Sequence, residues 1–403
     1  MRPLRPATRL LRAGRPDRGW VNTPVTRGST FVFGDVEHWR DARARREHER
    51  TLSYGARGTD STHALEDALV ELEGGHRAAL FPTGQAAIAT VMLAMLKAGD
   101  HVLVTDAVYE PARRLCSGLL SRQGIAHDFY RADGSDIEAR IRPQTRLIYA
   151  ECPGSLVFEM IDLPALASMA RSHGCRLAVD NTWGSGINYN PLRLGADISI
   201  LAGTKYLGGH SDVMMGAVVA NAETWPALQL ASVDLGQTVG ADDAFLVLRG
   251  IRSLAVRLAA HERNAMKVAL WLQSRPEVAC VHCPALPEHP RHALWKRDCR
   301  GTNGLLSIEF VTGIDAADVD RIVDSLELFG VGASWGGFAS LAVPVDIKAA
   351  RSVTGWATRG ELIRLHIGLE ETGDLIADLQ QAFDKVLNGR RPRTVSCQGG
   401  AWP

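Results

Sequence analysis

Short apolar runs alternate with longer segments of helical spacing between residues 62 and 245. The runs are rich in Val, Ile and Leu, and polar or glycine residues bound each of them. Continuous apolar runs are typical of strands buried on both faces, as in a parallel sheet with helical crossovers. The pattern therefore predicts an α/β fold with a mostly parallel central sheet covered by helices. The predicted strands are 78–81, 101–105, 147–150, 177–179 and 198–201, and the predicted helices include 86–96, 111–122 and 164–173.

The pattern changes beyond residue 245. A long helical stripe covers 242–275, and a proline-containing stretch follows it. The later segments predict a smaller α+β domain, with strands at 304–311 and 361–367 and helices at 315–329 and 372–387. We expect an N-terminal arm (1–55), a first domain (56–245), a second domain (246–388) and a disordered tail (389–403).

The N-terminal arm ends in a charged stretch at 41–50, which we interpret as a solvated helix. A further helix is expected to begin at about residue 62, with Thr62 as its N-cap and a stripe of leucines on one face. These elements precede the first predicted strand.

Composition narrows the class of protein. The chain has 403 residues with 45 basic and 45 acidic side chains, and this balance argues against bulk nucleic-acid binding. An apolar fraction of 46% excludes disorder as the main state. The longest apolar stretch, 86–96, is too short to cross a bilayer, so we expect no membrane partner and a cytoplasmic location. The seven cysteines are odd in number and irregularly spaced; we expect reduced thiols and, from the single Cys280–Cys283 pair, no metal site.

Three places in the sequence, each next to a predicted strand or at the start of a predicted helix, carry candidate functional residues. Lys205 comes just after an apolar strand, where a partly desolvated lysine can become a Schiff-base nucleophile. Asp180 stands at the carboxyl end of another strand, where it can pair with the protonated pyridine nitrogen of pyridoxal phosphate (PLP). Gly84 and Gln85 open a helix whose N–H groups can cradle a phosphate. Each has a simpler interpretation (a solvated lysine, an N-cap, a glycine turn), but their order is more specific than any one of them.

Two further residues fit a cofactor and its substrate. Tyr109 follows the strand at 101–105 and can stack on a cofactor ring, or it is a rim tyrosine. Arg364 lies within an apolar strand and needs an anionic partner, which is either a substrate α-carboxylate or a structural carboxylate.

Together with their flanking motifs, these residues resemble a known family. The motifs include Ala107-Val-Tyr-Glu-Pro, Val179-Asp-Asn-Thr-Trp, Gly203-Thr-Lys-Tyr-Leu, Ser334-Trp-Gly-Gly-Phe and Ile363-Arg-Leu-His-Ile-Gly-Leu-Glu. Over residues 8–388 the chain resembles the cysteine/methionine-metabolism PLP enzymes of fold type I, and within them the bacterial cystathionine β-lyases. The resemblance implies a PLP-dependent carbon–sulfur lyase of transsulfuration and methionine biosynthesis. It also implies an aspartate aminotransferase-like fold whose PLP-binding domain is 56–245.

The resemblance assigns roles to individual residues. Lys205 is expected to be the Schiff-base lysine, and Tyr109 and Tyr54 the other catalytic residues. The cofactor would be held by Gly84, Gln85, Thr204, Asp180, Tyr109, Tyr54 and Arg57. The amino-acid substrate would be bound by Arg364, Ser334, Trp335, Arg114 and Arg40. Because Tyr54 would come from a neighbouring subunit, we expect a homo-oligomer, most simply a dimer of dimers.

Three departures from the family pattern concern the substrate end and the phosphate. Ala56 stands where the family has an arginine that grips phosphate, and Arg57 is a partial substitute. Ala333 replaces a tyrosine, and Arg114 replaces an acid. We therefore expect β-elimination from cystathionine or another S-substituted L-cysteine. The alternatives are a specialised cysteine-S-conjugate β-lyase, a γ-lyase or γ-synthase, and, least favoured, a non-catalytic PLP-binding relative.

Overall fold

The computed structural model of the protein describes residues 4–46, 48–353, 356 and 360–387. Its larger sheet has seven strands in the order β1-β7-β6-β5-β4-β2-β3. Only β7 runs antiparallel to its two neighbours, so the sheet is mostly parallel, as predicted. The strands are β1 (Arg77–Phe81), β2 (His101–Thr105), β3 (Ala126–Tyr130), β4 (Thr145–Glu151), β5 (Arg176–Asp180), β6 (Ile198–Ala202) and β7 (Gly216–Ala220).

Two of these strands were missed from the sequence. Strand β3 lies at the edge of the sheet and includes His127 and Asp128, so it is not an apolar run. Strand β7 is fully buried and apolar. It was missed because it directly follows the glycine-rich stretch after Lys205, with no polar boundary between the two. The five predicted strands all appear.

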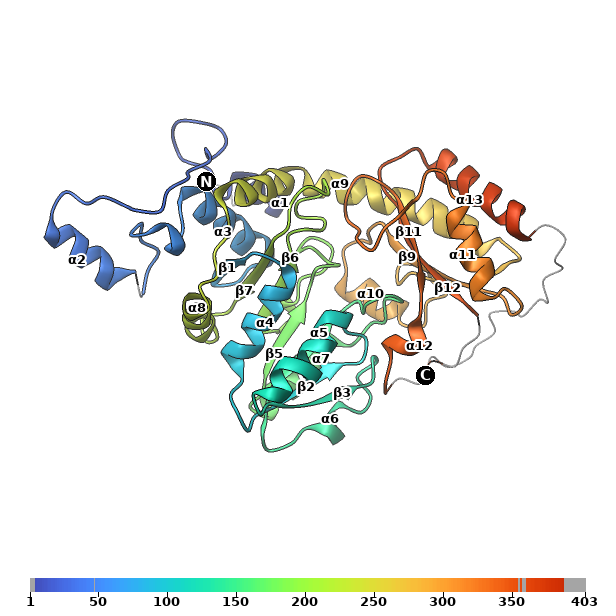
Figure 1. The fold of residues 1–403 in the computed structure, drawn as a ribbon, viewed down its shortest axis with the longest axis horizontal. Helices are drawn as coiled ribbons and strands as arrows, with labels where there is room; N and C mark the ends of the chain where they lie inside the picture. The colour runs from blue at the N-terminus through green and yellow to red at the C-terminus, as the bar shows by residue number, and fades with distance from the viewer. Residues whose placement is uncertain (1–3, 47, 354–355, 357–359, 388–403) are drawn as a thin grey trace.

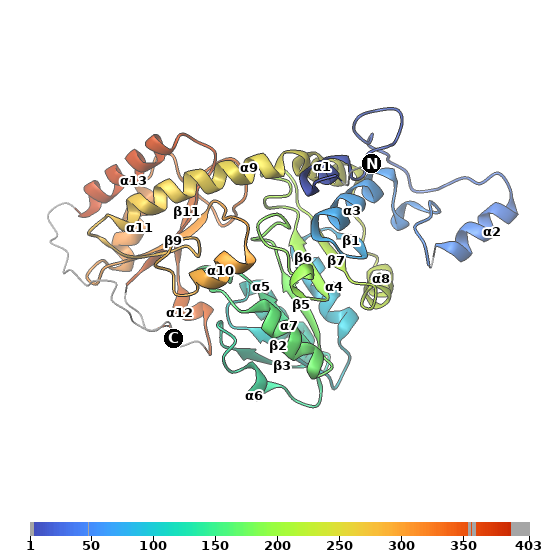
Figure 2. The same ribbon diagram turned by 180° about the vertical axis from the view of Figure 1, so that it is seen from behind.

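Helices cover both faces of this sheet (Figures 1 and 2). Successive strand residues point to opposite faces, so Val102 and Val104 join one core cluster while Leu103 joins another. One face carries α4 (Gly84–Met95), α5 (Glu110–Leu115) and α8 (Trp225–Asp234). The other face carries α3 (Asp60–Glu73), α7 (Leu163–Ser172) and the first part of α9 (Ala241–Gln273).

Two helix predictions need correction. Helix α3 begins at Asp60 and its N-cap is Thr59, whose N–H donates to Thr62 Oγ1 at 2.8 Å. Thr62 therefore lies inside the first turn. The helix expected at 111–122 is α5 followed by a π-helical segment, η2 (Cys116–Leu120), so its backbone is wider in its second half.

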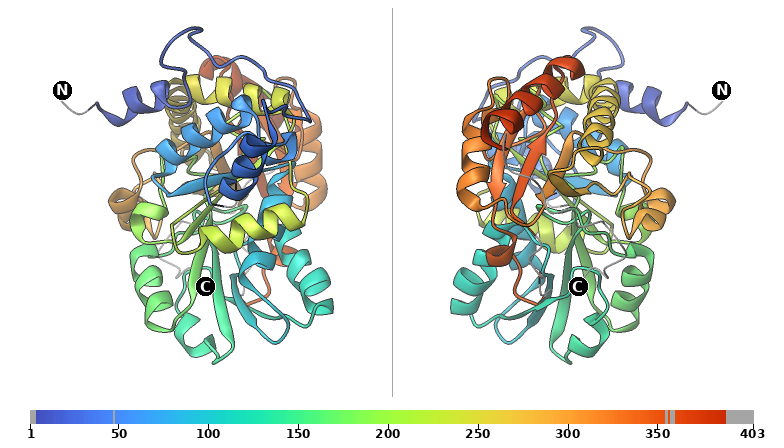
Figure 3. Two further views of the ribbon diagram at one scale, coloured as in Figure 1. Left: turned by 90° about the vertical axis from the view of Figure 1, so that its left-hand side faces the viewer. Right: turned by 90° about the vertical axis from the view of Figure 1, so that its right-hand side faces the viewer.

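A smaller unit is built on a five-stranded sheet in the order β10-β11-β12-β9-β8. Its apolar core lies between this sheet, the second half of α9, and helices α11 and α13, which face the viewer in the right panel of Figure 3. The strands are β8 (Val278–His282), β9 (Leu305–Phe310), β10 (Gly330–Val331), β11 (Leu341–Val345) and β12 (Leu362–His366). The helices are α10 (His292–Asp298), α11 (Ala316–Asp324), α12 (Ile347–Ala350) and α13 (Thr372–Leu387). This unit agrees with the predicted fold class, but the helix expected at 315–329 ends at Asp324.

The domain boundaries themselves stay a prediction. The expected boundary at 245–246 falls inside α9, whose 33 residues contact α3 at one end and β8 and β9 at the other. The expected tail, 389–403, lies outside the described residues.

The N-terminal arm begins against the rest of the chain and then extends away from it. Helix α1 (Pro6–Arg12) packs on α3 and α9, and Arg252 donates to Leu10 O and Ala13 O at 2.8 Å. Helix α2 (Val36–Arg45) stands apart at the far left of Figure 1 and is followed by the short η1 (Gly55–Arg57). The helix expected at 41–50 therefore begins earlier and ends at Arg45. Along the arm, Trp20 is 78% and Val32 85% exposed, which is costly for apolar side chains in water.

Within the described ranges, no helix is both long and apolar enough to cross a bilayer.

Candidate active site

The carboxyl ends of the parallel strands open into a cavity of about 320 Å³. Open α/β sheets bind ligands at this edge, because loops that leave adjacent strands in opposite directions leave a crevice there. The cavity also receives residues of the smaller unit, so it lies between the two sheets. Its lining includes Gly84, Gln85, Tyr109, Glu151, Asp180, Thr204, Lys205, Trp335 and Arg364.

Lys205 lies three residues beyond β6, where its N–H donates to Ala202 O at 3.1 Å and turns the chain into the cavity. Its Nζ donates to Ser334 Oγ at 2.8 Å and lies 5.2 Å from the centre of the Trp335 ring. Burial, reinforced by the charge of Arg364, lowers the pKa of Lys205 to about 8, although Asp180 opposes the shift. At pH 7 about a tenth of the amine is therefore unprotonated and able to act as a nucleophile, far more than for an ordinary lysine.

Asp180 and Glu151 end the neighbouring strands β5 and β4 and stand in register. Thr182 N donates to Asp180 Oδ1 at 2.9 Å, while burial raises the pKa of Asp180. Glu151 Oε2 accepts from Tyr109 N at 2.7 Å, and burial beside Asp180 raises the pKa of Glu151 well above its ordinary value. Two neighbouring carboxylates repel each other. At least one of them therefore tends to bind a proton, unless a cation lies beside them.

The N-terminus of α4 faces the same cavity. Thr83 Oγ1 accepts from Ala86 N at 3.0 Å, which caps the helix. A Cβ at position 84 would lie 3.0 Å from Ala202 Cβ, so glycine allows the helix end to approach β6 closely. Gln85 Nε2 donates to Pro111 O, and its Oε1 is buried with no partner in the part of the chain described. The end of α4 thus offers N–H groups to an anion.

Arg364 enters the cavity from β12. Its Nη2 donates to Ala333 O at 2.9 Å, and burial lowers its pKa. Its Nε is buried and has no hydrogen-bond partner among the described residues. A partly buried guanidinium that has an unused donor, and no carboxylate paired with it among the described residues, suits an anionic ligand such as an α-carboxylate.

Comparison with known proteins decides the family. The model of the family described as "Cys/Met metabolism PLP-dependent enzyme" matches residues 7–384. The chain belongs to this family. It is 48% identical to a cystathionine beta-lyase of Bordetella avium (92% of this chain, 94% of that protein) and 41% identical to the cystathionine beta-lyase MetC of Escherichia coli K12 (94% and 98%). A solved cystathionine gamma-lyase from Lactobacillus plantarum, complexed with L-serine, superposes with a TM-score of 0.84 at 28% identity, covering 95% of this chain and 99% of that one.

The residues of this Cys/Met-metabolism enzyme fit its cofactor. Asp180 is a buried carboxyl group, and a cation beside it would stabilise its ionised form. The protonated pyridine nitrogen of PLP would be such a cation. The N-terminus of α4, which Gly84 allows to lie close to β6, presents backbone N–H groups that can donate to a phosphate. Lys205 lies in the same cavity. The predictions of the family, the fold class and PLP dependence are confirmed.

Two predicted roles meet competing contacts in the structure. Thr204 Oγ1 donates to Met215 O at 3.2 Å and accepts from Met215 N at 3.0 Å, so its hydroxyl is already engaged. The Ser334 hydroxyl contacts Lys205, whereas Arg364 reaches the backbone oxygens of Ala333 and Ser334. The phosphate role of Thr204 and the carboxylate role of Ser334 stay predictions.

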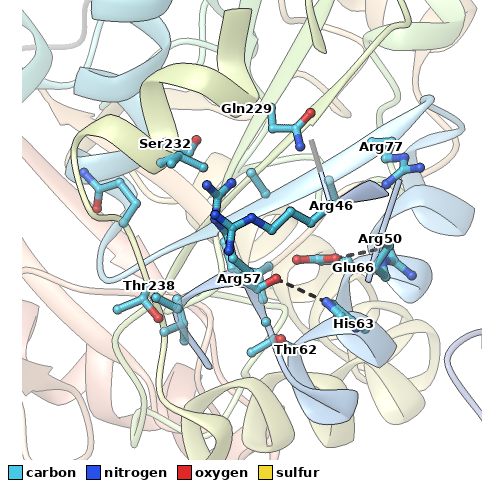
Figure 4. A pocket seen from close by; sticks show the side chains of 18 of the residues that line it. Arg46, Arg50, Arg57, Thr62, His63, Glu66, Arg77, Gln229, Ser232 and Thr238 are labelled. Atoms are coloured by element: carbon cyan, nitrogen blue, oxygen red, sulfur yellow. Dashed lines mark hydrogen bonds and ion pairs between the residues drawn. The ribbon is translucent and has the colours of Figure 1, made fainter. Parts of the chain in front are cut away.

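Besides Ser334, four predicted residues are absent from the lining of the cavity in this chain. Arg114 lies on α5 with a side chain 72% exposed, 3.6 Å from Glu110, and Arg40 is exposed on α2. Tyr54 is 51% exposed beside η1. Arg57 and Ala56 line a second pocket against α3 and α8, where Figure 4 shows Arg57 beside Arg46. Their expected contribution to a neighbouring subunit stays a prediction.

Sequence reasoning missed Glu151 and the apolar wall of the cavity. Glu151 could have been found by the signal that singled out Asp180, an acid at the end of a buried strand. Leu156 and Phe158 line the cavity from a loop in which both have positive φ, 76° and 61°. Such backbone conformations concentrate at functional sites, but no local sequence pattern announces them.

Proposed function

We propose that this Cys/Met-metabolism enzyme is a carbon–sulfur lyase. It would eliminate the thiol from cystathionine or a related S-substituted L-cysteine and leave pyruvate and ammonia. The observation that carries the proposal is the meeting, in one cavity, of a lysine with a pKa of about 8, a buried carboxyl and a partly buried arginine with an unused donor. The cystathionine β-lyases among the relatives support the same activity.

Each group has a task that its surroundings favour. Bound PLP would draw electrons from the substrate's Cα and so make its proton acidic. Arg364 would bind the α-carboxylate through two N–H donors of its guanidinium. Asp180, in its ionised form, would pair with the protonated ring nitrogen. Lys205 Nζ, held by Ser334, would take the Cα proton and return one to the leaving sulfur. Water would then release ammonia and pyruvate, so that atoms balance against substrate plus one water.

Two features bear on β- against γ-chemistry. The Ser334-Trp-Gly-Gly motif resembles the β-lyases and provides the contact to Lys205. Ala333 lines the cavity where that pattern has tyrosine, and the space it leaves favours a γ-lyase or γ-synthase as the second candidate.

Product analysis separates the two. Purified PLP-loaded protein incubated with L-cystathionine is expected to yield pyruvate and homocysteine in equal amounts. Formation of 2-oxobutyrate with cysteine, and without pyruvate, would contradict β-elimination. Keto-acid products can be resolved by chromatography after derivatisation.

Arg114 is proposed to select the thiol portion. It lies on the helix that follows Tyr109, where it pairs with the exposed Glu110, and it presents a positive charge to solvent. Coulomb repulsion would disfavour the distal ammonium of cystathionine, and an anionic or neutral thiol portion would be preferred.

The Arg114→Asp variant tests this selection. We expect its kcat/KM for cystathionine to rise, relative to S-methylcysteine, by about three- to tenfold, the scale of a partly screened charge reversal. Arg122→Asp, at another exposed arginine further along the chain, is the matched control and should leave the ratio unchanged. An unaltered ratio in Arg114→Asp would remove Arg114 from the recognition of substrate.

The assembly is also a proposal. The exposed apolar side chains of the arm, together with the positions of Tyr54 and Arg57 outside this chain's own cavity, support a homo-oligomer in which the arm covers a neighbour. We propose a dimer of dimers in the cytoplasm, acting in methionine biosynthesis.

A further inference from the structure

The 333–337 loop lies between Lys205 and Arg364 and contacts both. Ser334 Oγ accepts from Lys205 Nζ at 2.8 Å. Arg364 Nη2 donates to Ala333 O at 2.9 Å and, more weakly, to Ser334 O at 3.4 Å. Arg364, which we assign to the substrate carboxylate, therefore also contacts the loop whose Ser334 side chain contacts Lys205.

The same loop is pressed against the backbone of Lys205. Gly336 has φ +88°, and a Cβ there would lie 2.7 Å from Tyr206 N and 2.9 Å from Lys205 C. A Cβ at Gly337 would lie 2.2 Å from Ser211 Oγ. The loop is therefore closely packed against the segment that carries Lys205. Because it is closely packed, a movement of the loop also changes its contacts with Lys205.

His366 anchors this loop from below. It is 1% exposed and follows Arg364 by two residues on β12, so both side chains lie on one face of the strand. Its Nε2 lies 3.2 Å from Gly336 N and 3.0 Å from Gly337 O. An N–H only donates and a carbonyl only accepts, so a neutral imidazole makes one of these bonds in each tautomer, and either bond ties the loop to β12.

The surroundings of His366 keep it neutral. The His261 ring from α9 lies 5.3 Å away and the Tyr206 ring 6.0 Å away, centre to centre. Burial lowers the pKa of His366 to about 3; the bond to Gly337 O opposes this shift, and His261, Arg364 and Lys205 add to it. The anchor is therefore unchanged over the pH range in which Lys205 titrates.

We propose that His366 is a positioning residue that keeps Ser334 on Lys205 when Arg364 turns to the substrate carboxylate. A carboxylate that binds Nε and Nη2 of Arg364 would share the nitrogen that donates to Ala333 O, and that contact with the loop would weaken. The contact of His366 involves no group that binds substrate, so it persists. This inference rests on the proposed role of Arg364 as the carboxylate site.

Two variants test the anchor. His366→Leu fills the space without a hydrogen-bonding atom, whereas His366→Gln returns an amide that can donate or accept near the Nε2 position. In the PLP-loaded protein without substrate, we expect His366→Leu to move the pH midpoint of the visible absorbance band by about half a unit or more. With substrate, its kcat should fall about tenfold while KM changes by less than about twofold. His366→Gln should restore most of both.

His261→Leu is the matched control. His261 is also fully buried, with a pKa lowered to about 4, but its Nδ1 contacts Ile367 O at 2.9 Å and not the loop. We expect it to lower the melting temperature as much as His366→Leu and to leave the absorbance midpoint in place. If both leucine variants changed the midpoint equally, or neither did, His366 would be only a packing residue. The absorbance titration needs no turnover, so it stands even if the enzyme makes no pyruvate from cystathionine.

Discussion

The Lys205→Ala variant is expected to lose nearly all elimination activity. Its rate of pyruvate formation should fall by about 10²–10⁴-fold, the usual contribution of a positioned acid–base group, and further where the amine also acts as a nucleophile. The variant should also lack the absorbance band of lysine-bound PLP. The physical reason is that Lys205 is the only lysine among the described residues that line the cavity, so no other side-chain amine can replace it there.

The measurement is a visible spectrum and a pyruvate assay on the same preparation. Lys97→Ala, which removes an exposed lysine far from the cavity, is the matched control and should behave like the wild type. A Lys205→Ala protein that kept the band would show that another amine holds the cofactor. Retained pyruvate formation would contradict the assignment of Lys205 as the proton carrier.

The second large effect is expected from Asp180→Asn. Asparagine keeps the shape and can still accept from Thr182 N, but it removes the negative charge that we assign to the ring nitrogen. We expect kcat to fall on the order of a hundredfold or more, as for other losses of preorganised charge. PLP affinity should fall as well.

The folding stability of the unloaded protein should move the other way. Burial raises the pKa of Asp180, so its ionised form costs folding free energy at neutral pH, and this cost grows as pH rises through the folded pKa. Asp180→Asn removes the cost, and unloaded protein should melt at the same or a higher temperature. A lower melting temperature would mean that the charge stabilises the fold by itself.

Glu73→Gln provides the comparison. Glu73 is completely buried outside the cavity, and burial raises its pKa to about 7. Glutamine can keep the bond from Asn181 Nδ2, which is 2.9 Å long. We expect Glu73→Gln to leave both kcat and PLP affinity unchanged, so that a loss confined to Asp180→Asn reports on the cofactor and not on burial.

The sequence alone determined the parts of the site that depend on one strand and its following turn. Asp180, Lys205 and Gly84 each stand next to a buried strand, and an apolar run is readable without knowledge of its partners. Because parallel strands bring their carboxyl ends to one edge, these residues had to meet. The family, fold class and cofactor followed from the same motifs and are confirmed.

Only the tertiary structure decided how the two sheets complete the site. Ser334 and Arg364 are far from Lys205 in the chain, and neither their contact with each other nor the 2.8 Å bond to Nζ follows from local spacing. The hydroxyl of Thr204 was taken by Met215, and the side chain of Arg114 proved to point to solvent, because neighbouring backbone and exposure decide what a polar group meets. Residue type and strand position are local properties, whereas pairing, burial and pKa depend on atoms brought together from distant parts of the chain.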